Sequence, residues 1–184
     1  ARLDAGRELR REEVDLVGLL VDTVADACAA GPAHDWRLDL AVLEPPADAT
    51  AEEAEDFLPE PPLVIGDEAR LRQVVVNLLA NARVHTPAGS HVTTTLARER
   101  DTLIVRIHDD GPGIAPDVRD RLFERFARGD SSRERRTGST GLGMSIALAI
   151  VQSHGGSIDV DSSTAPEDHG TTFTVRLPAA AVEE

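Results

Sequence analysis

Residues 63–86 read LVIGDEARLRQVVVNLLANARVHT, a short apolar run followed by a longer segment with apolar side chains at helical spacing. Leu63 to Ile65 is typical of a short strand, and Asp67 is an expected N-cap for the following helix. The apolar positions form one stripe, which predicts that this helix packs on a core. They are Leu71, Val74, Val75, Leu78, Leu79 and Ala82. Pro87 marks the expected end of the helix.

The segments on either side of this stretch complete the predicted fold. A helix is expected from Asp15 to its stop at Gly31-Pro32, and alternating apolar residues predict a half-buried strand from Trp36 to Val42. Further strands are expected at 91–97, 102–108, 157–161 and 171–177, and further helices at 116–127 and 142–154. Because helices and strands do not alternate regularly, we expect a sheet that is covered on one face by helices.

Composition narrows the classes of function. The chain has 184 residues, enough for one domain, and its 19 basic residues are all Arg. A net charge of −14 argues against nucleic acid as a partner, because contact with phosphates needs a basic surface. Cys28 is the only cysteine, which excludes an internal disulfide.

Two amides on the helix after Asp67 are the first candidate site. Asn77 and Asn81 are four residues apart and therefore lie on one face, one turn above the other. An Asn carbonyl is a hard oxygen ligand of the kind that suits Mg²⁺ carried by a nucleotide. The alternative is a pair of solvated or capping amides.

Two glycine-rich segments are the other candidates. Residues 109–113 read DDGPG at the end of a predicted strand, where an ionised Asp could accept a hydrogen bond from an exocyclic amine. Residues 138–143 read GSTGLG and open a helix, where free backbone amides favour an anion. Taken singly, each is also compatible with an ordinary turn.

The order and separation of these three segments resemble the catalytic ATP-binding domain of bacterial two-component sensor histidine kinases, in the GHKL ATPase superfamily. Residues 77–82 look like the N box of that family, 109–113 the G1 box, 122–126 the F box and 138–143 the G2 box. The resemblance spans Val14 to Leu177. It implies a Bergerat-type fold, an α/β (α+β) sandwich in which helices cover one face of a mixed sheet. It also implies binding of ATP with Mg²⁺.

The resemblance also implies roles for individual residues. Asn81 would coordinate Mg²⁺, and Asn77 would support the nucleotide or the metal. Asp109 would contact the adenine amine, with Gly111 and Gly113 shaping its pocket. The G2-box residues expected to bind the nucleotide are Gly138, Thr140, Gly141, Leu142 and Gly143.

Several basic residues are expected near the phosphates. Residues 113–140 would form the ATP lid, from which Arg128 would act on the phosphates as a catalytic residue and Arg125 is the second choice. Arg83 stands two positions after Asn81. For its side chain, a contact with phosphate and the absence of such a contact are equally expected. His85 would border the nucleotide, with a structural histidine as the alternative.

The resemblance predicts how the chain fits into a larger protein. Residues 1–13 would be the end of a dimerisation helix or a linker, and residues 14–184 would be the catalytic domain. Within this domain, segment 44–62 is rich in proline and acidic residues. We expect it to be a flexible loop, with a docking segment as the alternative. None of the six histidines lies in the setting of a phosphoacceptor, so we expect that residue on a separate dimerisation domain N-terminal to Ala1. The predicted partners are ATP, this acceptor domain and a cognate response regulator. We expect a monomeric cytoplasmic fragment of a homodimeric parent in the cell membrane.

The residue at position 77 separates the kinase prediction from its rivals. Members of the superfamily that use water or serine resemble one another in having Glu at this position as a general base. Asn77 cannot take up a proton and so cannot act as this base. A histidine acceptor needs less help from a base, because a nitrogen of the neutral ring already carries a lone pair. The other interpretations are a nucleotide-binding module without kinase output, a hydrolytic or serine-directed enzyme, and a domain that binds no nucleotide.

Overall fold

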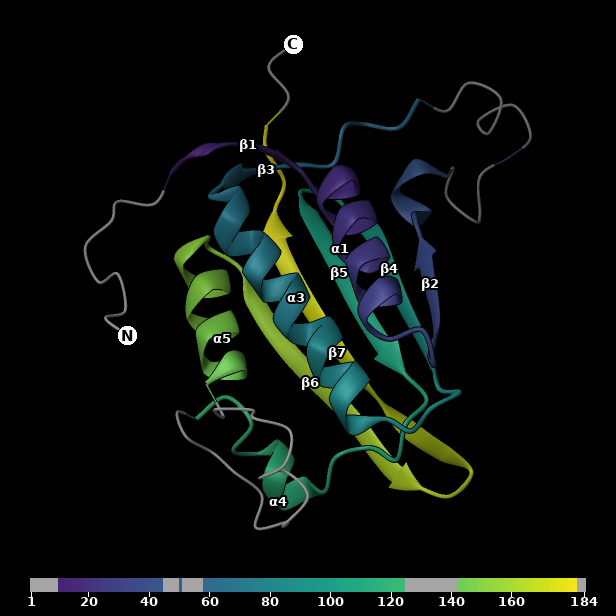
Figure 1. The fold of residues 1–184 in the computed structure, drawn as a ribbon. Coiled ribbons are helices and arrows are strands. Elements are labelled where there is room, and N and C mark those ends of the chain that lie inside the picture. The colour runs from purple at the N-terminus through teal and green to yellow at the C-terminus, as the bar shows by residue number, and fades with distance from the viewer. Residues whose placement is uncertain (1–9, 45–49, 51–57, 125–141, 182–184) are drawn as a thin grey trace.

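A computed structural model describes residues 10–44, 50, 58–124 and 142–181 (Figure 1). Its main feature is a five-stranded sheet with the strand order β2-β4-β5-β7-β6. The strands are β2 (Asp35–Asp39), β4 (His91–Glu99), β5 (Thr102–Asp109), β6 (Ser157–Ala165) and β7 (Asp168–Pro178). Strand β2 is parallel to β4 and the other neighbouring pairs are antiparallel, so the sheet is mixed, as predicted.

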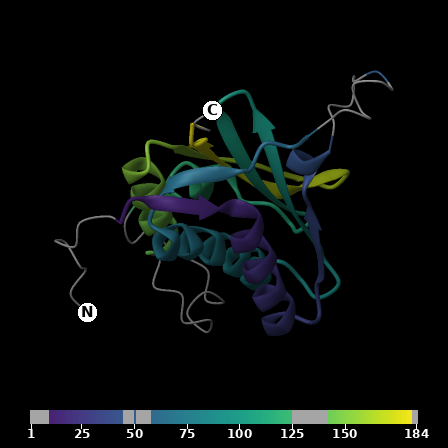
Figure 2. The ribbon, with the colours of Figure 1, turned by 90° about the horizontal axis from the view of Figure 1, so that it is seen from above.

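Three helices cover one face of this sheet, which confirms the predicted sandwich (Figures 1 and 2). They are α1 (Leu16–Ala30), α3 (Glu68–His85) and α5 (Gly143–Ser153). Each of the first two begins at a predicted cap: Asp15 Oδ1 accepts a hydrogen bond from Val17 N at 2.9 Å, and Asp67 Oδ1 accepts one from Arg70 N at 3.1 Å. None of the described helices has the length and apolar character needed to cross a membrane.

A two-stranded ribbon precedes α1 and α3. Strand β1 (Glu12–Asp15) pairs antiparallel with β3 (Leu63–Gly66), and Val14, paired with Val64, is buried. The ribbon therefore crosses the predicted boundary between residues 13 and 14, because Glu12 and Glu13 belong to the same strand as Val14. Residues 1–9 and most of the segment 44–62 lie outside the described part.

Several other elements differ from the prediction. Strand β2 stops at Asp39, and a 3-10 helix, η1 (Ala41–Leu43), buries Val42 instead of the expected strand. Helix α4 covers only Pro116–Arg119 and is followed by turns as far as Glu124, while residues 125–127 lie outside the described part. The alternating apolar residues correctly predicted that Val42 is buried. They did not predict the element, because a 3-10 turn can bury this side chain as well as a strand can. Strands β6 and β7 extend further than predicted because they pair as one hairpin from Ser157 to Pro178.

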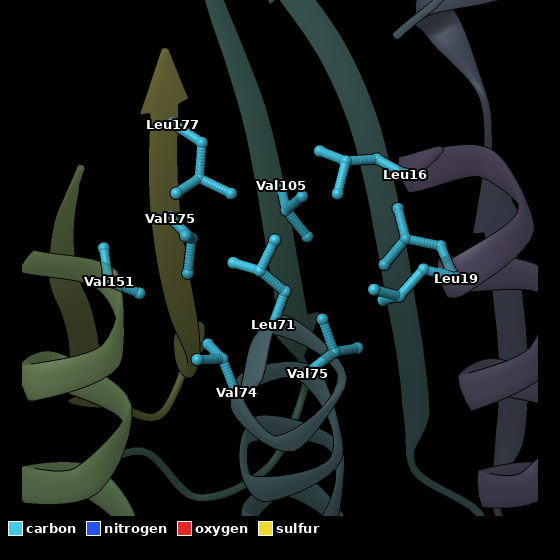
Figure 3. A pocket seen from close by; sticks show the side chains of 10 residues that line it. Leu16, Leu19, Leu71, Val74, Val75, Val105, Val151, Val175 and Leu177 are labelled. Atoms are coloured by element: carbon cyan, nitrogen blue, oxygen red, sulfur yellow. The ribbon is translucent and has the colours of Figure 1, made fainter. Parts of the chain in front are cut away.

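The core lies between the helices and the sheet and is almost entirely aliphatic. Figure 3 shows the part where α1, α3 and α5 face β5 and β7, with Leu71, Val105 and Val175 pointing toward one another. A small cavity there is lined by aliphatic side chains alone. A cavity without a polar group cannot fix the base or the phosphates of a nucleotide, so this cavity is a packing feature of the core.

His154 connects α5 to the beginning of α3. Its Nδ1 donates to the carbonyl oxygen of Ile150 at 2.8 Å, and its Nε2 accepts a hydrogen bond from Asp67 N at 3.0 Å. A carbonyl only accepts and an amide N–H only donates, so both bonds require the neutral ring. Gly66 makes room for the ring, because a Cβ at position 66 would overlap it.

Replacing His154 by Ala should destabilise the domain by about 1–3 kcal/mol, because the amide of Asp67 loses its acceptor in a partly buried place. Thermal unfolding measures this change. The matched control is His108→Ala, which removes a hydrogen bond of 2.9 Å to Thr172 from the uncovered face of the sheet. Equal unfolding temperatures for the two variants would contradict the assigned role of His154.

Candidate functional site

One end of the molecule brings together the segments that the sequence singled out. The C-terminal half of α3, the end of β5 and the beginning of α5 meet at the lower end of the view in Figure 1. The clearest contact between them is a hydrogen bond of 3.1 Å from Asn77 Nδ2 to the carbonyl oxygen of Gly143. The N-box and G2-box segments, 66 residues apart, are therefore neighbours in space.

Asn77 and Asn81 use their amides differently, although both are half-buried on one face of α3. Asn77 holds the first residue of α5 through its Nδ2. Asn81, one turn later, has no side-chain hydrogen bond to any residue that the structure describes, so its amide oxygen is available. A free, half-buried carbonyl oxygen is a suitable single ligand for Mg²⁺, which would take its remaining ligands from phosphates and water.

Asp109 is the last residue of β5 and is only 4% exposed. Its Oδ1 accepts a hydrogen bond from Gly111 N at 3.0 Å, and Oδ2 has no partner within the described residues. Burial raises the pKa of this carboxyl above its ordinary value, more than the hydrogen bond from Gly111 lowers it. A buried carboxylate with one free oxygen is well suited to accept a hydrogen bond from a flat ligand with an exocyclic amine.

The glycines after Asp109 are required by close contacts. A Cβ on Gly111 would overlap the methyl group of Thr86, which follows α3. Gly113 has a φ of +74°, and a Cβ there would overlap the carbonyl oxygen of Ser163 in β6. The loop after β5 therefore lies directly against its neighbours on both sides.

Asp110 behaves in the opposite way to its neighbour. Its carboxylate accepts hydrogen bonds from the main-chain N and the ring Nδ1 of His91, both at 2.8 Å. Burial alone would raise the pKa of Asp110, but these hydrogen bonds outweigh it and the pKa lies below its ordinary value. Asp110 thus links the end of β5 to the start of β4, and its carboxylate is bound to His91 instead of being available to a base.

The other predicted site residues in the described part of the chain lie at different places in the fold. Arg83 Nη1 donates to the carbonyl oxygen of Ala30 at 3.2 Å, so its guanidinium caps the end of α1. On a helix, a residue two places after Asn81 points about 200° away from it, so this position favours the alternative in which Arg83 makes no phosphate contact. His85 ends α3 and is close enough to Asp109 to act electrostatically on its carboxylate. Leu142 and Gly143 begin α5 as expected.

Five predicted residues cannot be placed, because residues 125–141 lie outside the described part of the chain. They are Arg125, Arg128, Gly138, Thr140 and Gly141. Within the described part, no group of three or more His, Cys, Asp or Glu side chains comes together to hold a metal ion.

Thr171 is a site residue that the sequence did not reveal. It is 4% exposed and pairs directly with Asp109 between β7 and β5. Its hydroxyl lies 3.0 Å from Ser162 Oγ. A Gly-Thr pair at the start of a strand carries no local sign of function, and only the register of β5 and β7 brings Thr171 beside the buried carboxylate.

Comparison with known proteins gives a consistent result. Residues 66–181 match the family of histidine kinase-, DNA gyrase B-, and HSP90-like ATPases. A probable sensor histidine kinase of Mycobacterium tuberculosis, TcrY, is 49% identical over 97% of this chain and 33% of its own length. The sensor histidine kinase TrcS of the same organism is 37% identical over 97% of the chain and 32% of its own length. The chain thus spans about a third of the length of these curated relatives.

Solved structures extend the likeness to the fold. The mycobacterial sensor histidine kinase MprB superposes with a TM-score of 0.72 at 26% identity, covering 94% of this chain and 99% of that one. Full-length ShkA, solved in complex with AMPPNP, superposes with a TM-score of 0.69 at 27% identity, covering 97% of this chain and 33% of that one.

Proposed function

Because the chain belongs to the family of histidine kinase-, DNA gyrase B-, and HSP90-like ATPases and has the ATP-binding domain found in sensor histidine kinases, we propose that it positions MgATP for transfer of the γ-phosphoryl group to a histidine. The histidine would lie on a separate dimerisation domain of the full-length protein. A response regulator would then receive the phosphoryl group. The observation that carries this proposal is the buried carboxylate of Asp109, whose Oδ2 has no partner within the described residues.

Each described residue has a distinct part in the proposed site. Asp109 Oδ2 accepts a hydrogen bond from the adenine amine, while Gly111 and Gly113 let the loop after β5 pack closely against Thr86 and Ser163. Asn81 offers its oxygen to Mg²⁺, which when bound would neutralise charge on the phosphates. Gly143, held by Asn77, presents the start of α5 to the phosphates.

The hydrogen bond of Asn77 supports kinase chemistry over hydrolysis. The side chain at this position points to the carbonyl oxygen of Gly143 and donates to it. A glutamate would place a carboxylate against that carbonyl, where two acceptors repel each other. In this chain the position therefore holds α5 in place and supplies no base to activate a water molecule.

Calorimetric titration with ATP, with and without Mg²⁺, tests the proposal. The wild type should bind more tightly with Mg²⁺, and Asn81→Ala should reduce this affinity about ten-fold or more, to the level without Mg²⁺. Gln73→Ala is the matched control, because it removes another amide of α3, two turns earlier. Absence of ATP binding by the wild type would contradict the proposed function.

A second measurement separates a kinase from a nucleotide-binding module without output. Radiolabelled ATP should give no labelled protein with this chain alone, and should label a histidine when the dimerisation domain of the parent is added. Binding of ATP without transfer to that domain would favour the module.

A further inference from the structure

The tip of the β6–β7 hairpin supports the loop after Asp109. We use the term hairpin tip for Ser162, Ser163, His169 and Gly170, which lie in β6 and β7 next to the turn. None of these residues belongs to the segments that the sequence singled out for nucleotide binding. Two hydrogen bonds and two close backbone approaches join the hairpin tip to the end of β5 and to the loop 111–114.

His169 makes the first of these hydrogen bonds. Its ring Nδ1 lies 2.8 Å from the carbonyl oxygen of Gly111. Because a carbonyl oxygen only accepts, Nδ1 carries the proton and donates it. This bond holds Gly111, whose main-chain N donates to Asp109 Oδ1 at 3.0 Å, so the ring of His169 is linked through Gly111 to the Asp109 carboxylate.

Ser162 makes the second hydrogen bond and has a full set of partners. Its Oγ accepts a hydrogen bond from Ile114 N at 2.8 Å and donates to the carbonyl oxygen of Gly170 at 2.8 Å. The hydroxyl of Thr171, at 3.0 Å, supplies the third partner. A hydroxyl with three partners is held in one orientation, so it fixes the far end of the loop.

Two close backbone approaches also bring the hairpin tip against the loop and the end of β5. A Cβ on Gly113 would overlap the carbonyl oxygen of Ser163, and a Cβ on Gly170 would lie 2.5 Å from the carbonyl oxygen of Asp109. Both contacts are between backbones, so no side-chain rotation can relieve them. The loop is therefore seated on the hairpin tip at both of its ends.

We propose that Ser162 and His169 are positioning residues for adenine recognition, because they hold the loop 111–114 where Asp109 can meet the exocyclic amine of the base. This inference rests on the proposed function, in which Asp109 recognises that amine. Neither side chain needs to touch the nucleotide. Both act through the loop.

The test compares the affinities for ATP and for inosine triphosphate, which carries an oxygen in place of the amine. Wild-type protein should prefer ATP by about ten-fold or more, since a hydrogen bond to a carboxylate is lost with inosine. His169→Ala should reduce this preference about three-fold, and the double variant with Ser162→Ala should bring it near one. His169→Asn should restore it, because the Asn amide places an N–H close to the position of Nδ1.

Two control variants separate positioning from general damage to the hairpin. Ser157→Ala removes a serine at the opposite end of β6. His108→Ala removes a histidine near the end of β5, from the face of the sheet that the helices do not cover. Both should keep the wild-type preference for ATP. The Mg²⁺ dependence of binding should be the same in all variants.

The outcomes are distinct. A wild type that binds both nucleotides equally would mean that the proposed adenine contact of Asp109 is wrong, and the inference would be lost with it. A wild type that prefers ATP, together with an unchanged preference in the double variant, would overturn the inference alone. An equal loss of both affinities in the double variant would also overturn it, because the hairpin tip would then support the fold and not the base contact.

Discussion

Asp109→Asn should weaken ATP binding about 100-fold and, in the absence of nucleotide, raise the temperature of unfolding. The amide oxygen of Asn can still accept the hydrogen bond from Gly111 N, so the loop is kept. The amide nitrogen then stands where Oδ2 faces the adenine amine, and two donors oppose each other. Loss of a charge-assisted hydrogen bond and the repulsion of the donors both reduce affinity.

The gain in stability follows from the raised pKa of Asp109, whose main cause is burial. A folded pKa above the unfolded value means that this carboxyl stabilises the fold at low pH and that its contribution is lost as the pH rises through the folded pKa. Above its folded pKa the wild type therefore holds an unfavourable buried charge that Asn lacks. The difference in unfolding temperature between variant and wild type should shrink as the pH falls through the folded pKa.

Asp110→Asn is the matched control, because it changes the adjacent carboxylate and should act in the opposite direction. The pKa of Asp110 is lowered by its hydrogen bonds with His91, against the effect of burial. Its contribution is present above the unfolded pKa and is lost as the pH falls through the folded pKa. This variant should be less stable than the wild type at neutral pH and should bind ATP nearly as well. Two variants that shift stability in the same direction would contradict the opposite pKa shifts of the two carboxyl groups.

Gly113→Ala should reduce the free energy of unfolding by at least about 3 kcal/mol or displace the loop, with at least a ten-fold loss of ATP affinity in either case. The added Cβ would overlap the carbonyl oxygen of Ser163. That oxygen belongs to the backbone of β6, where Ser163 pairs with Gly170, so it cannot move away without breaking the hairpin. Thermal unfolding and calorimetric titration together measure both effects.

Gly155→Ala isolates the contribution of backbone conformation. Gly155 has a φ of +73°, against +74° for Gly113, but a Cβ there meets only Pro178 Cγ at 3.6 Å. This control should cost about 1 kcal/mol, which is typical of a left-handed residue with a side chain, and leave ATP binding unchanged. If both variants lost the same free energy of unfolding, the overlap with Ser163 would not contribute to the effect of Gly113→Ala.

The sequence predicted the three long helices because their apolar positions repeat at helical spacing, and the N-caps of α1 and α3 are local. The N-caps Asp15 and Asp67 each bond an amide within three residues, so nothing distant is needed to find them. The mixed sheet under helices followed from the order of the elements and from the family resemblance.

Features that depend on distant partners were not predictable in the same way. Residues 12–15 read EEVD, and only their pairing with β3 makes them a strand. Thr171 is part of the site because it stands opposite Asp109 in the register of β5 and β7. Arg83 is a different case, because helical phase alone points it away from Asn81 and so favours the alternative without a phosphate contact.

The position of β5 in the middle of the sheet also affects how the protein opens. Both of its edges are hydrogen-bonded to antiparallel neighbours, and Leu103, Ile104 and Ile107 are at most 1% exposed. Amide protons in such a strand exchange with solvent deuterium only when the whole sheet separates. Asp109 closes this strand, so the carboxylate that we propose for adenine recognition belongs to a strand whose amides should exchange slowly.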